Sequence, residues 1–454
     1  MEKSIQKIYN KIGVKSLRTK NITKHVLLSF FYKGGSILAN FLLVPITINY
    51  LNTENYGIWL TISSFVSWFS FFDIGLGNGL RNKLSEAKAK GAIRLAKGYV
   101  STAYFTIGIV CLILIFSFTV INTFIDWTKV FNTSHSLKKD LEILMPIVFG
   151  FFCLQLVVKL ITTIYTADQH HSTQGKINFI TQVGSLILIW IMTLTTRSSL
   201  LIFGTIFSIF PVFILLIFSF LAFNSRYADL KPSMALWQTK YFKDIFGLGF
   251  TFFIVQISGI ILFTTDNIII SKLFSPAEVV PYNISYKYFG ISIMIFNILA
   301  SPFWSSITEA YHNNDLDWIK TSMKNFKKLS YFFIAALLVM FLVSEFIYKF
   351  WIGTSTHIDN SLNLFTSLHY AIILIATPYT IFLNGIGKIK LQAIQGLMVA
   401  IINIPISIWF THVFNLGVTG IILGTNICLI PTIILSIIQY KKIISKSALG
   451  IWNA

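Results

Sequence analysis

Residues 56–97 form the stretch that most constrains what this chain can fold into. The run at residues 57–72 is rich in aromatic residues, contains no ionisable side chain, and is just long enough to cross the hydrocarbon core of a bilayer as a helix. It is followed by Asp73, a glycine-dense turn at residues 75–79 and a segment with six Lys and Arg residues at 81–97. This order predicts a membrane span whose second end lies at a cytoplasmic surface.

The composition extends this interpretation to nearly the whole chain. Hydrophobic residues make up 55% of the 454 residues and charged residues only 12%, which is too little polar surface for a water-soluble protein of this size. The net charge of +19 does not favour a nucleic-acid partner, because the basic residues recur in short segments between apolar runs instead of gathering in one domain. We therefore expect an integral membrane protein.

Apolar runs of sufficient length predict twelve membrane spans. Of the 36 Lys and Arg residues, 27 fall in the two terminal segments and in connections on the same side of the membrane, and only 6 on the other side. This bias predicts that both termini are cytoplasmic. The expected spans are residues 26–48, 57–74, 98–121, 141–165, 178–196, 200–223, 246–273, 281–304, 329–351, 361–383, 391–412 and 416–440.

Two short motifs recur at equivalent points of the two halves. Leu-Ser-Glu-Ala at residues 84–87 corresponds to Ile-Thr-Glu-Ala at 307–310, and Gly-Lys-Ile at 175–177 recurs at 387–389. Because each half holds an even number of spans, the repeats are expected to be related by an axis along the membrane normal. The predicted fold is all-α, with a basic N-terminal segment (1–25), an N-lobe of six helices (26–223), a cytoplasmic linker (224–245), a C-lobe of six helices (246–440) and a cytoplasmic tail (441–454).

Ionisable residues inside the expected spans are the candidates for function. A charge at the middle of a bilayer costs about 2.5 to 3.5 kcal/mol on insertion scales, so each should face protein, a partner or water. Asp266 and Lys287 lie at similar depth on consecutive antiparallel spans. A pair between them could act as a switch, opened by protonation of Asp266 or by an anionic substrate group at Lys287. The alternative is a permanent structural ion pair.

Further candidates lie in other spans. Lys33 could approach Asp73 at the inner end of the second span, or its ammonium could extend to the cytosol, as could that of Lys159. Glu345 and His369 lie in the outer halves of consecutive spans, where a Glu/His couple could relay a proton. The alternative for Glu345 is exposure at the membrane interface.

The remaining polar residues give weaker signals. Asn40 and Asn283 are among the span amides that could contact sugar hydroxyls in a cavity, or could bond across helices instead. The chain has no phosphate-binding glycine loop, and His170 and His171 lack the spacing of a metal site. We therefore expect neither an enzyme nor a metal cofactor.

Several motifs match a known pattern. These are residues 56–59 (YGIW), 73–82 (DIGLGNGLRN) and 84–87 in the first half, and 266–270 (DNIII), 282–287 (YNISYK) and 306–310 (SITEA) in the second. They resemble the signature of Wzx-type O-antigen flippases, the polysaccharide-transport branch of the MATE/MOP superfamily. The resemblance covers essentially the whole chain, including the expected number of spans and their duplication.

The resemblance implies a specific transport activity. A member of this family moves undecaprenyl-diphosphate-linked O-antigen repeat units from the cytoplasmic to the periplasmic leaflet of the bacterial inner membrane. It implies two MATE-like six-helix lobes around a cationic cavity, alternating access and coupling to H⁺ or Na⁺. Lys287 would meet the diphosphate, Asp266 would be the neighbouring switch, and Lys33 and Lys159 would be cations of the first lobe. Implied partners are membrane lipids, a polysaccharide polymerase and a chain-length regulator.

Two other classes were weighed against a flippase. A MATE-like antiporter of small cations would favour a cavity dominated by carboxylates, whereas the spans hold Lys33, Lys159 and Lys287 against Asp266 and Glu345. A polysaccharide polymerase is expected to have a large outer loop, which the sequence lacks, and an acyltransferase would need a buried histidine, for which His369 is the main candidate. The sequence therefore favours the flippase.

Overall fold

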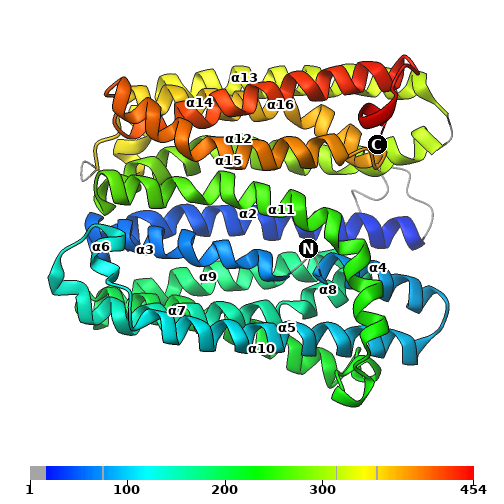
Figure 1. Cartoon of the computed structure of the whole chain (residues 1–454), viewed down its shortest axis with the longest axis horizontal. Coiled ribbons are helices and arrows are strands. Elements are labelled where there is room, and N and C mark those ends of the chain that lie inside the picture. The colour runs from blue at the N-terminus through cyan, green and yellow to red at the C-terminus, as the bar shows by residue number, and fades with distance from the viewer. Residues whose placement is uncertain (1–16, 74–75, 169, 313, 354–355, 454) are drawn as a thin grey trace. The chain divides into compact units, whose positions relative to one another are not determined.

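The computed structural model describes residues 17–73, 76–168, 170–312, 314–353 and 356–453. Within these residues all regular structure is helical (Figure 1). Long helices joined by short connections dominate, which is the arrangement expected when every backbone polar group must be satisfied inside a bilayer. The prediction of an all-α fold is confirmed.

Nine helices among the described residues are long and apolar enough to cross a membrane. They are α2 (Leu17–Leu51), α5 (Ile93–Asn122), α7 (Lys138–Val158) continued by α8 (Leu160–Ala167), α9 (His171–Thr195), α10 (Leu200–Phe223), α13 (Leu316–Ile352), α14 (Asn360–Gly385), α15 (Lys390–Val413) and α16 (Val418–Ile444). The other three expected spans correspond to α3 (Thr53–Ser67), which continues into the 3₁₀ helix η1 (Trp68–Asp73), and to α11 (Thr239–Leu273) and α12 (Pro276–His312).

Large apolar side chains cover the outward faces of these helices. On α13, Phe332, Phe346 and Phe350 are 68%, 73% and 86% exposed, whereas Phe326 on the same helix is buried. An apolar surface of this extent would be unfavourable in water and fits contact with lipid tails. The chain is therefore a multi-pass membrane protein.

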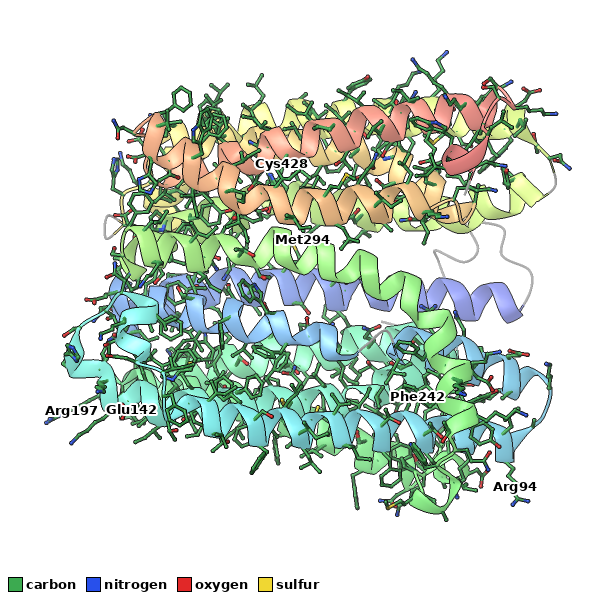
Figure 2. The ribbon with its side chains drawn as sticks, viewed as in Figure 1. Arg94, Glu142, Arg197, Phe242, Met294 and Cys428 are labelled. Atoms are coloured by element: carbon green, nitrogen blue, oxygen red, sulfur yellow. The ribbon has the colours of Figure 1, made fainter. Side chains whose placement is uncertain are left out.

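The first of two compact units contains the described residues of Met1–Leu51, Phe72–Asp126 and Lys138–Phe252. In it α2 packs along α9, while α5, α7 and α10 pack together. Figure 2 shows Arg94 at one end of this unit and Glu142 and Arg197 at the other. These are the ends that the distribution of Lys and Arg assigns to the cytoplasmic and outer sides.

Helix α4 (Leu76–Ala89) is the basic segment that follows the second expected span. Its Leu76, Leu80 and Leu84 are buried, and they recur every four residues on one face. That face packs on α5 and α8, and Arg81 on the other side is exposed. The segment is therefore an amphipathic helix of the first unit, as its sequence pattern indicated.

The second unit contains Asn52–Phe71, Trp127–Leu137 and Phe253–Ala454. Helix α12 packs on α3, α13 and α14, and α16 packs on both α14 and α15. Helices α3 and α6 (Trp127–Phe131) belong to the first half of the sequence, yet they pack with helices of the second half. Ser271 Oγ on α11 donates to the carbonyl of Phe131, 2.7 Å away, which ties α6 to this unit.

Gly57 allows α3 to approach the start of α12 closely. A Cβ at this position would overlap the backbone carbonyl of Pro276. We expect Gly57→Ala to lower the free energy of unfolding by about 1–3 kcal/mol, because overpacking forces the backbone to shift. Thermal unfolding of the purified protein should show a lower Tm.

Gly150 on α7 supplies the matched control, because a Cβ there meets nothing within 4 Å. Gly150→Ala should leave the Tm unchanged or raise it slightly, since alanine favours a helix more than glycine does. Equal Tm values for the two variants would contradict the close contact between α3 and α12.

Candidate functional site

The carboxylate of Asp266 is buried inside the second unit. It lies on α11 and is 2% exposed. Its Oδ2 accepts a hydrogen bond from the hydroxyl of Tyr282 on α12, at 2.5 Å. Its Oδ1 is buried and has no hydrogen-bond partner among the described residues. A buried carboxylate with one unpartnered oxygen is a place where a proton can be taken up.

A half-buried tyrosine, Tyr286, lies one helical turn further along α12. Tyr286 stacks on Tyr282 with ring centroids 5.5 Å apart, and its hydroxyl lies 2.6 Å from Nε2 of His369 on α14. Nδ1 of His369 lies 2.9 Å from Oδ1 of Asn426 on α16. The side chains of Asp266, Tyr282, Tyr286, His369 and Asn426 thus form one buried network across four helices, called the Asp–His network below.

The hydrogen bonds of Asn426 assign the tautomer of His369. The amide nitrogen of Asn426 donates to the carbonyl of Phe365, 2.9 Å away, so its oxygen faces the imidazole and must accept from Nδ1–H. In neutral His369, Nε2 is then the acceptor for the hydroxyl of Tyr286. Nε2 is therefore the atom at which the imidazole can gain a proton.

Polar groups also join α3, α11 and α12 within this unit. The amide nitrogen of Asn267 donates to Oγ of Ser64 at 2.8 Å, and that of Asn283 donates to Oδ1 of Asn267 at 2.8 Å. Asn283 also donates to the carbonyl of Val279. Asn283, predicted as a residue that contacts substrate or bonds across helices, makes the helix-to-helix bond in this structure.

Lys287 does not pair with Asp266, which corrects the expected ion pair. Its half-buried ammonium lies 3.5 Å from the hydroxyl of Tyr56 on α3, and no carboxylate of the described residues lies within 4.0 Å of it. The reason is helical geometry: Tyr286 faces His369, and the next residue is rotated by about 100° around the helix. Lys287 therefore presents a cation that is free to meet an anionic group.

The expected couple between Glu345 and His369 is also wrong. Glu345 is 74% exposed and pairs with Lys349 at 2.9 Å, one turn along α13. The side chain of His369 is completely buried. The sequence predicts a similar membrane depth for the two residues. In the structure, however, Glu345 lies on the outward face of α13, whereas His369 lies on an inward face of α14.

The predicted residues Lys33, Asn40 and Lys159 belong to the first unit. Lys33 on α2 is exposed, and Asn40 on the same helix is half-buried. Lys159 is exposed and occupies the break between α7 and α8, where a single continuous span was expected. The side chain of Asp73 is outside the part of the structure that is described, and so is the contact expected between Asp73 and Lys33.

An ionic cluster that the sequence did not predict lies at the predicted cytoplasmic end of the first unit. Asp168 follows α8 and binds the ammonium of Lys88 on α4, Nη2 of Arg226 at 3.0 Å and the hydroxyl of Tyr227 at 3.0 Å. Burial opposes ionisation of this carboxyl, but the hydrogen bonds from Lys88 and Tyr227 outweigh it and lower the pKa of Asp168 below its ordinary value of 3.8. The cluster ties three segments distant in sequence together.

We expect Asp168→Asn to destabilise the protein by about 1–2 kcal/mol at neutral pH, because charge-assisted hydrogen bonds are lost at a partly solvated site. A carboxyl with a lowered pKa stabilises the fold above its unfolded-state pKa, and this contribution disappears as the pH falls through the folded-state value. The difference in Tm between wild type and variant should therefore shrink below pH 3.8, the ordinary value. A difference independent of pH would contradict the ionic role.

Comparison with known proteins places this arrangement in a family. A family model described as polysaccharide biosynthesis protein matches residues 22–307, more than half of the chain. The chain belongs to the polysaccharide biosynthesis protein family. The match runs from α2 into α12 and so includes Asp266, Tyr282, Tyr286 and Lys287.

Curated relatives in this family are named for O-antigen transport. A protein of Yersinia pseudotuberculosis named for O-antigen export is 24% identical over 399 residues, which cover 86% of this chain and 88% of the relative. A Salmonella typhi protein named as an O-antigen transporter is 22% identical and covers 90% of this chain and 94% of its own length. These names agree with the prediction of a transporter of the O-antigen flippase type instead of an enzyme.

Comparison with solved structures identifies the fold of this chain. An inward-facing multidrug resistance MATE transporter of the MOP superfamily has a TM-score of 0.72 at 13% identity and covers 93% of this chain and 95% of its own. An outward-facing MATE transporter has a TM-score of 0.64 at 13% identity and covers 94% and 96%. The predicted MATE-like fold is confirmed, and identities this low speak to the fold alone.

Two residues of the network could have been found from the sequence of this family member. Tyr282 and Tyr286 stand four residues apart, so they share one face of a helix. The span that carries the two tyrosines follows the span of Asp266, and it places them at a depth similar to that of Asp266. Tyrosine hydroxyls within a span need polar partners. The sequence gives no comparable signal for the contact between Tyr56 and Lys287, because the two residues are more than two hundred positions apart in the chain.

Proposed function

We propose that the protein is a flippase that moves undecaprenyl-diphosphate-linked O-antigen repeat units from the cytoplasmic to the periplasmic leaflet by alternating access. The family match, the names of the relatives and the MATE fold support this function. The observation that carries it is Lys287, a half-buried cation on α12 with a tyrosine hydroxyl as its neighbour. In a low-dielectric site an ammonium attracts a diphosphate far more strongly than in water.

The proposal includes a location and partners. The protein would reside in the bacterial inner membrane with both termini in the cytoplasm, which the distribution of Lys and Arg supports. Lys33 and Lys159 would add positive charge on the first unit, with Asn40 and Asn283 meeting sugar hydroxyls. A polysaccharide polymerase and a chain-length regulator would receive the repeat units on the periplasmic side.

The Asp–His network is proposed as the coupling site, with a proton as the ion. Asp266 offers an unpartnered carboxylate oxygen, and His369 offers Nε2 through the hydroxyl of Tyr286. A bound Na⁺ would need several oxygen ligands that present lone pairs, whereas the contacts around Asp266 and His369 are made by hydroxyl hydrogens. Asp73, the remaining predicted switch residue, would act in the first unit.

The direct test measures which leaflet holds the lipid-linked repeat units. In cells that lack the protein we expect these units to accumulate and to stay inaccessible to a membrane-impermeant glycosidase added to spheroplasts. Expression of the protein should make them accessible. Equal accessibility with and without the protein would contradict a flippase.

A second candidate function is export of small cationic compounds, which the similarity to multidrug MATE transporters favours. Such an antiporter would expel a cationic dye such as ethidium from loaded proteoliposomes when a proton gradient is imposed. We expect no dye export, because the half-buried cation Lys287 would repel such a substrate. Dye export without exposure of repeat units at the outer leaflet would replace the flippase with this function.

A further inference from the structure

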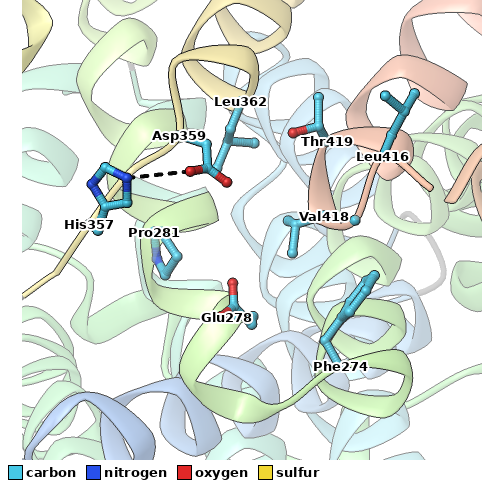
Figure 3. Close-up of a pocket in the computed structure, with 10 residues that line it drawn as sticks. Phe274, Glu278, Pro281, His357, Asp359, Leu362, Leu416, Val418 and Thr419 are labelled. Carbon is cyan, nitrogen blue, oxygen red and sulfur yellow. Dashed lines mark ion pairs between the residues drawn. The ribbon is translucent and has the colours of Figure 1, made fainter. Parts of the chain in front are cut away.

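A pocket of about 160 Å³ opens at the predicted outer ends of helices in the second unit (Figure 3). Three connections form it: the start of α12 with Phe274 and Glu278, the segment before α14 with His357 and Asp359, and the start of α16 with Thr419. The pocket lies at the first turns of α12, α14 and α16 and shares no residue with the Asp–His network.

The walls of the pocket combine hydrogen-bond acceptors with apolar surface. Figure 3 shows the carboxylates of Glu278 and Asp359 on facing sides of the opening, with the ring of Phe274 at its edge. Nε2 of His357 lies 3.5 Å from Oδ1 of Asp359. Small-ligand sites commonly have this composition, with apolar and aromatic walls and a few polar groups that orient the ligand.

Among the described residues, the contact of Asp359 with His357 is the only polar side-chain contact made by either carboxylate. Asp359 is the N-cap residue of α14, but its side chain makes no capping hydrogen bond, although an aspartate in this position usually does. Across the described residues, the carboxylate of Glu278 makes neither a hydrogen bond nor an ion pair. Both groups are therefore available as acceptors for a ligand in the pocket.

We propose that this pocket binds one neutral sugar ring of the repeat unit as it reaches the outer side. Carboxylates accept hydrogen bonds from adjacent hydroxyls, and the CH face of a sugar can pack on Phe274 and the other apolar walls. The volume equals that of about five water molecules at about 30 Å³ each, which is enough space for a single sugar ring. Two carboxylates would reject a sugar acid through like-charge repulsion.

The position of the pocket along α12 fits this role, and the inference rests on the proposed function. Nine residues separate Glu278 from Lys287, a distance of about 14 Å along the helix axis. The proposed diphosphate site and the sugar pocket therefore lie at different depths of one helix. A lipid-linked oligosaccharide likewise carries its sugars beyond its diphosphate.

Saturation-transfer NMR on the full chain in nanodiscs tests the pocket. The probes are methyl glucoside, methyl galactoside, methyl mannoside and N-acetylglucosamine, with glucuronate as the acidic comparison. We expect saturation transfer to at least one neutral probe and none to glucuronate. In the double variant Glu278→Gln/Asp359→Asn the signal should fall about tenfold, because two charge-assisted acceptors are lost.

Glu142→Gln is the matched control, since it makes the same change at an exposed carboxylate at the predicted outer end of the first unit (Figure 2). This variant should bind the sugar as the wild type does. If the double variant does not fold, the single variants Glu278→Gln and Asp359→Asn are each tested in the same way. Absence of signal with every neutral probe, or an equal signal in the double variant, would overturn the pocket; exposure of repeat units to the glycosidase would then still support the flippase.

Discussion

Lys287→Ala is expected to reduce delivery of repeat units to the outer leaflet about 100-fold and to abolish surface polysaccharide. The loss corresponds to about 2.7 kcal/mol of favourable interaction with the diphosphate, at about 1.36 kcal/mol per tenfold change in rate. The variant should fold, because Lys287 has no carboxylate partner that its removal would leave unpaired. Glycosidase accessibility in spheroplasts and the amount of protein in the membrane are the two measurements.

Two variants separate charge from packing in this prediction. Lys287→Arg keeps the positive charge and should retain a substantial part of the activity. Lys349→Ala removes an exposed lysine that pairs with Glu345 on the outward face of α13, and it should leave transport unchanged. Normal polysaccharide in Lys287→Ala would reject the assigned role, and so would equal losses in the alanine variants of Lys287 and Lys349.

Asp266→Asn is expected to remove the response of transport to a proton gradient. An amide cannot gain or lose a proton at this position, but its oxygen can still accept the hydrogen bond from Tyr282, so the fold is retained. Coupling free energies between sites are typically 1–3 kcal/mol, so gradient-driven transport should fall by about 5- to 150-fold. Initial rates in proteoliposomes, measured against external pH with and without a gradient, report this change.

Glu345→Gln is the control for this variant, because Glu345 is an exposed carboxylate outside the Asp–His network. Its pH profile should match that of the wild type. An unchanged profile in Asp266→Asn would show that the carboxylate is purely structural. If a sodium gradient drives wild-type transport in the absence of a proton gradient, the proton assignment is wrong even though the flippase stands.

The succession of helices was predictable from the sequence, whereas the direction that a side chain takes around its helix was not. Counting residues from the ends of spans placed Asp266 and Lys287 at a similar level, and also Glu345 and His369. The partners that each residue has in the structure depend on rotation about the helix axis: Tyr286 reaches His369, while Lys287, one residue later, reaches Tyr56. Equal depth was therefore a poor guide to contact.

The packing of α3 against α12 could not be predicted from the sequence either. Gly57 was visible as part of a motif, but its role depends on the carbonyl of Pro276, which approaches it from a distant part of the chain. The same holds for Asp168, whose three partners come from α4 and from the segment after α10. Such contacts arise from tertiary packing and leave no local periodicity.

The sequence by itself determined that this protein is helical and multi-pass, because the length of an apolar run is a local property that decides whether a segment can cross a bilayer. Its motifs added the resemblance to a family of transporters. Only the tertiary structure decided which buried groups meet. It separated Lys287 from Asp266 and joined Asp266, through two tyrosines, to the surroundings of His369. The physical reason is that hydrogen bonds form over about 3 Å, so the rotation of about 100° between consecutive helical residues decides which partner a side chain meets.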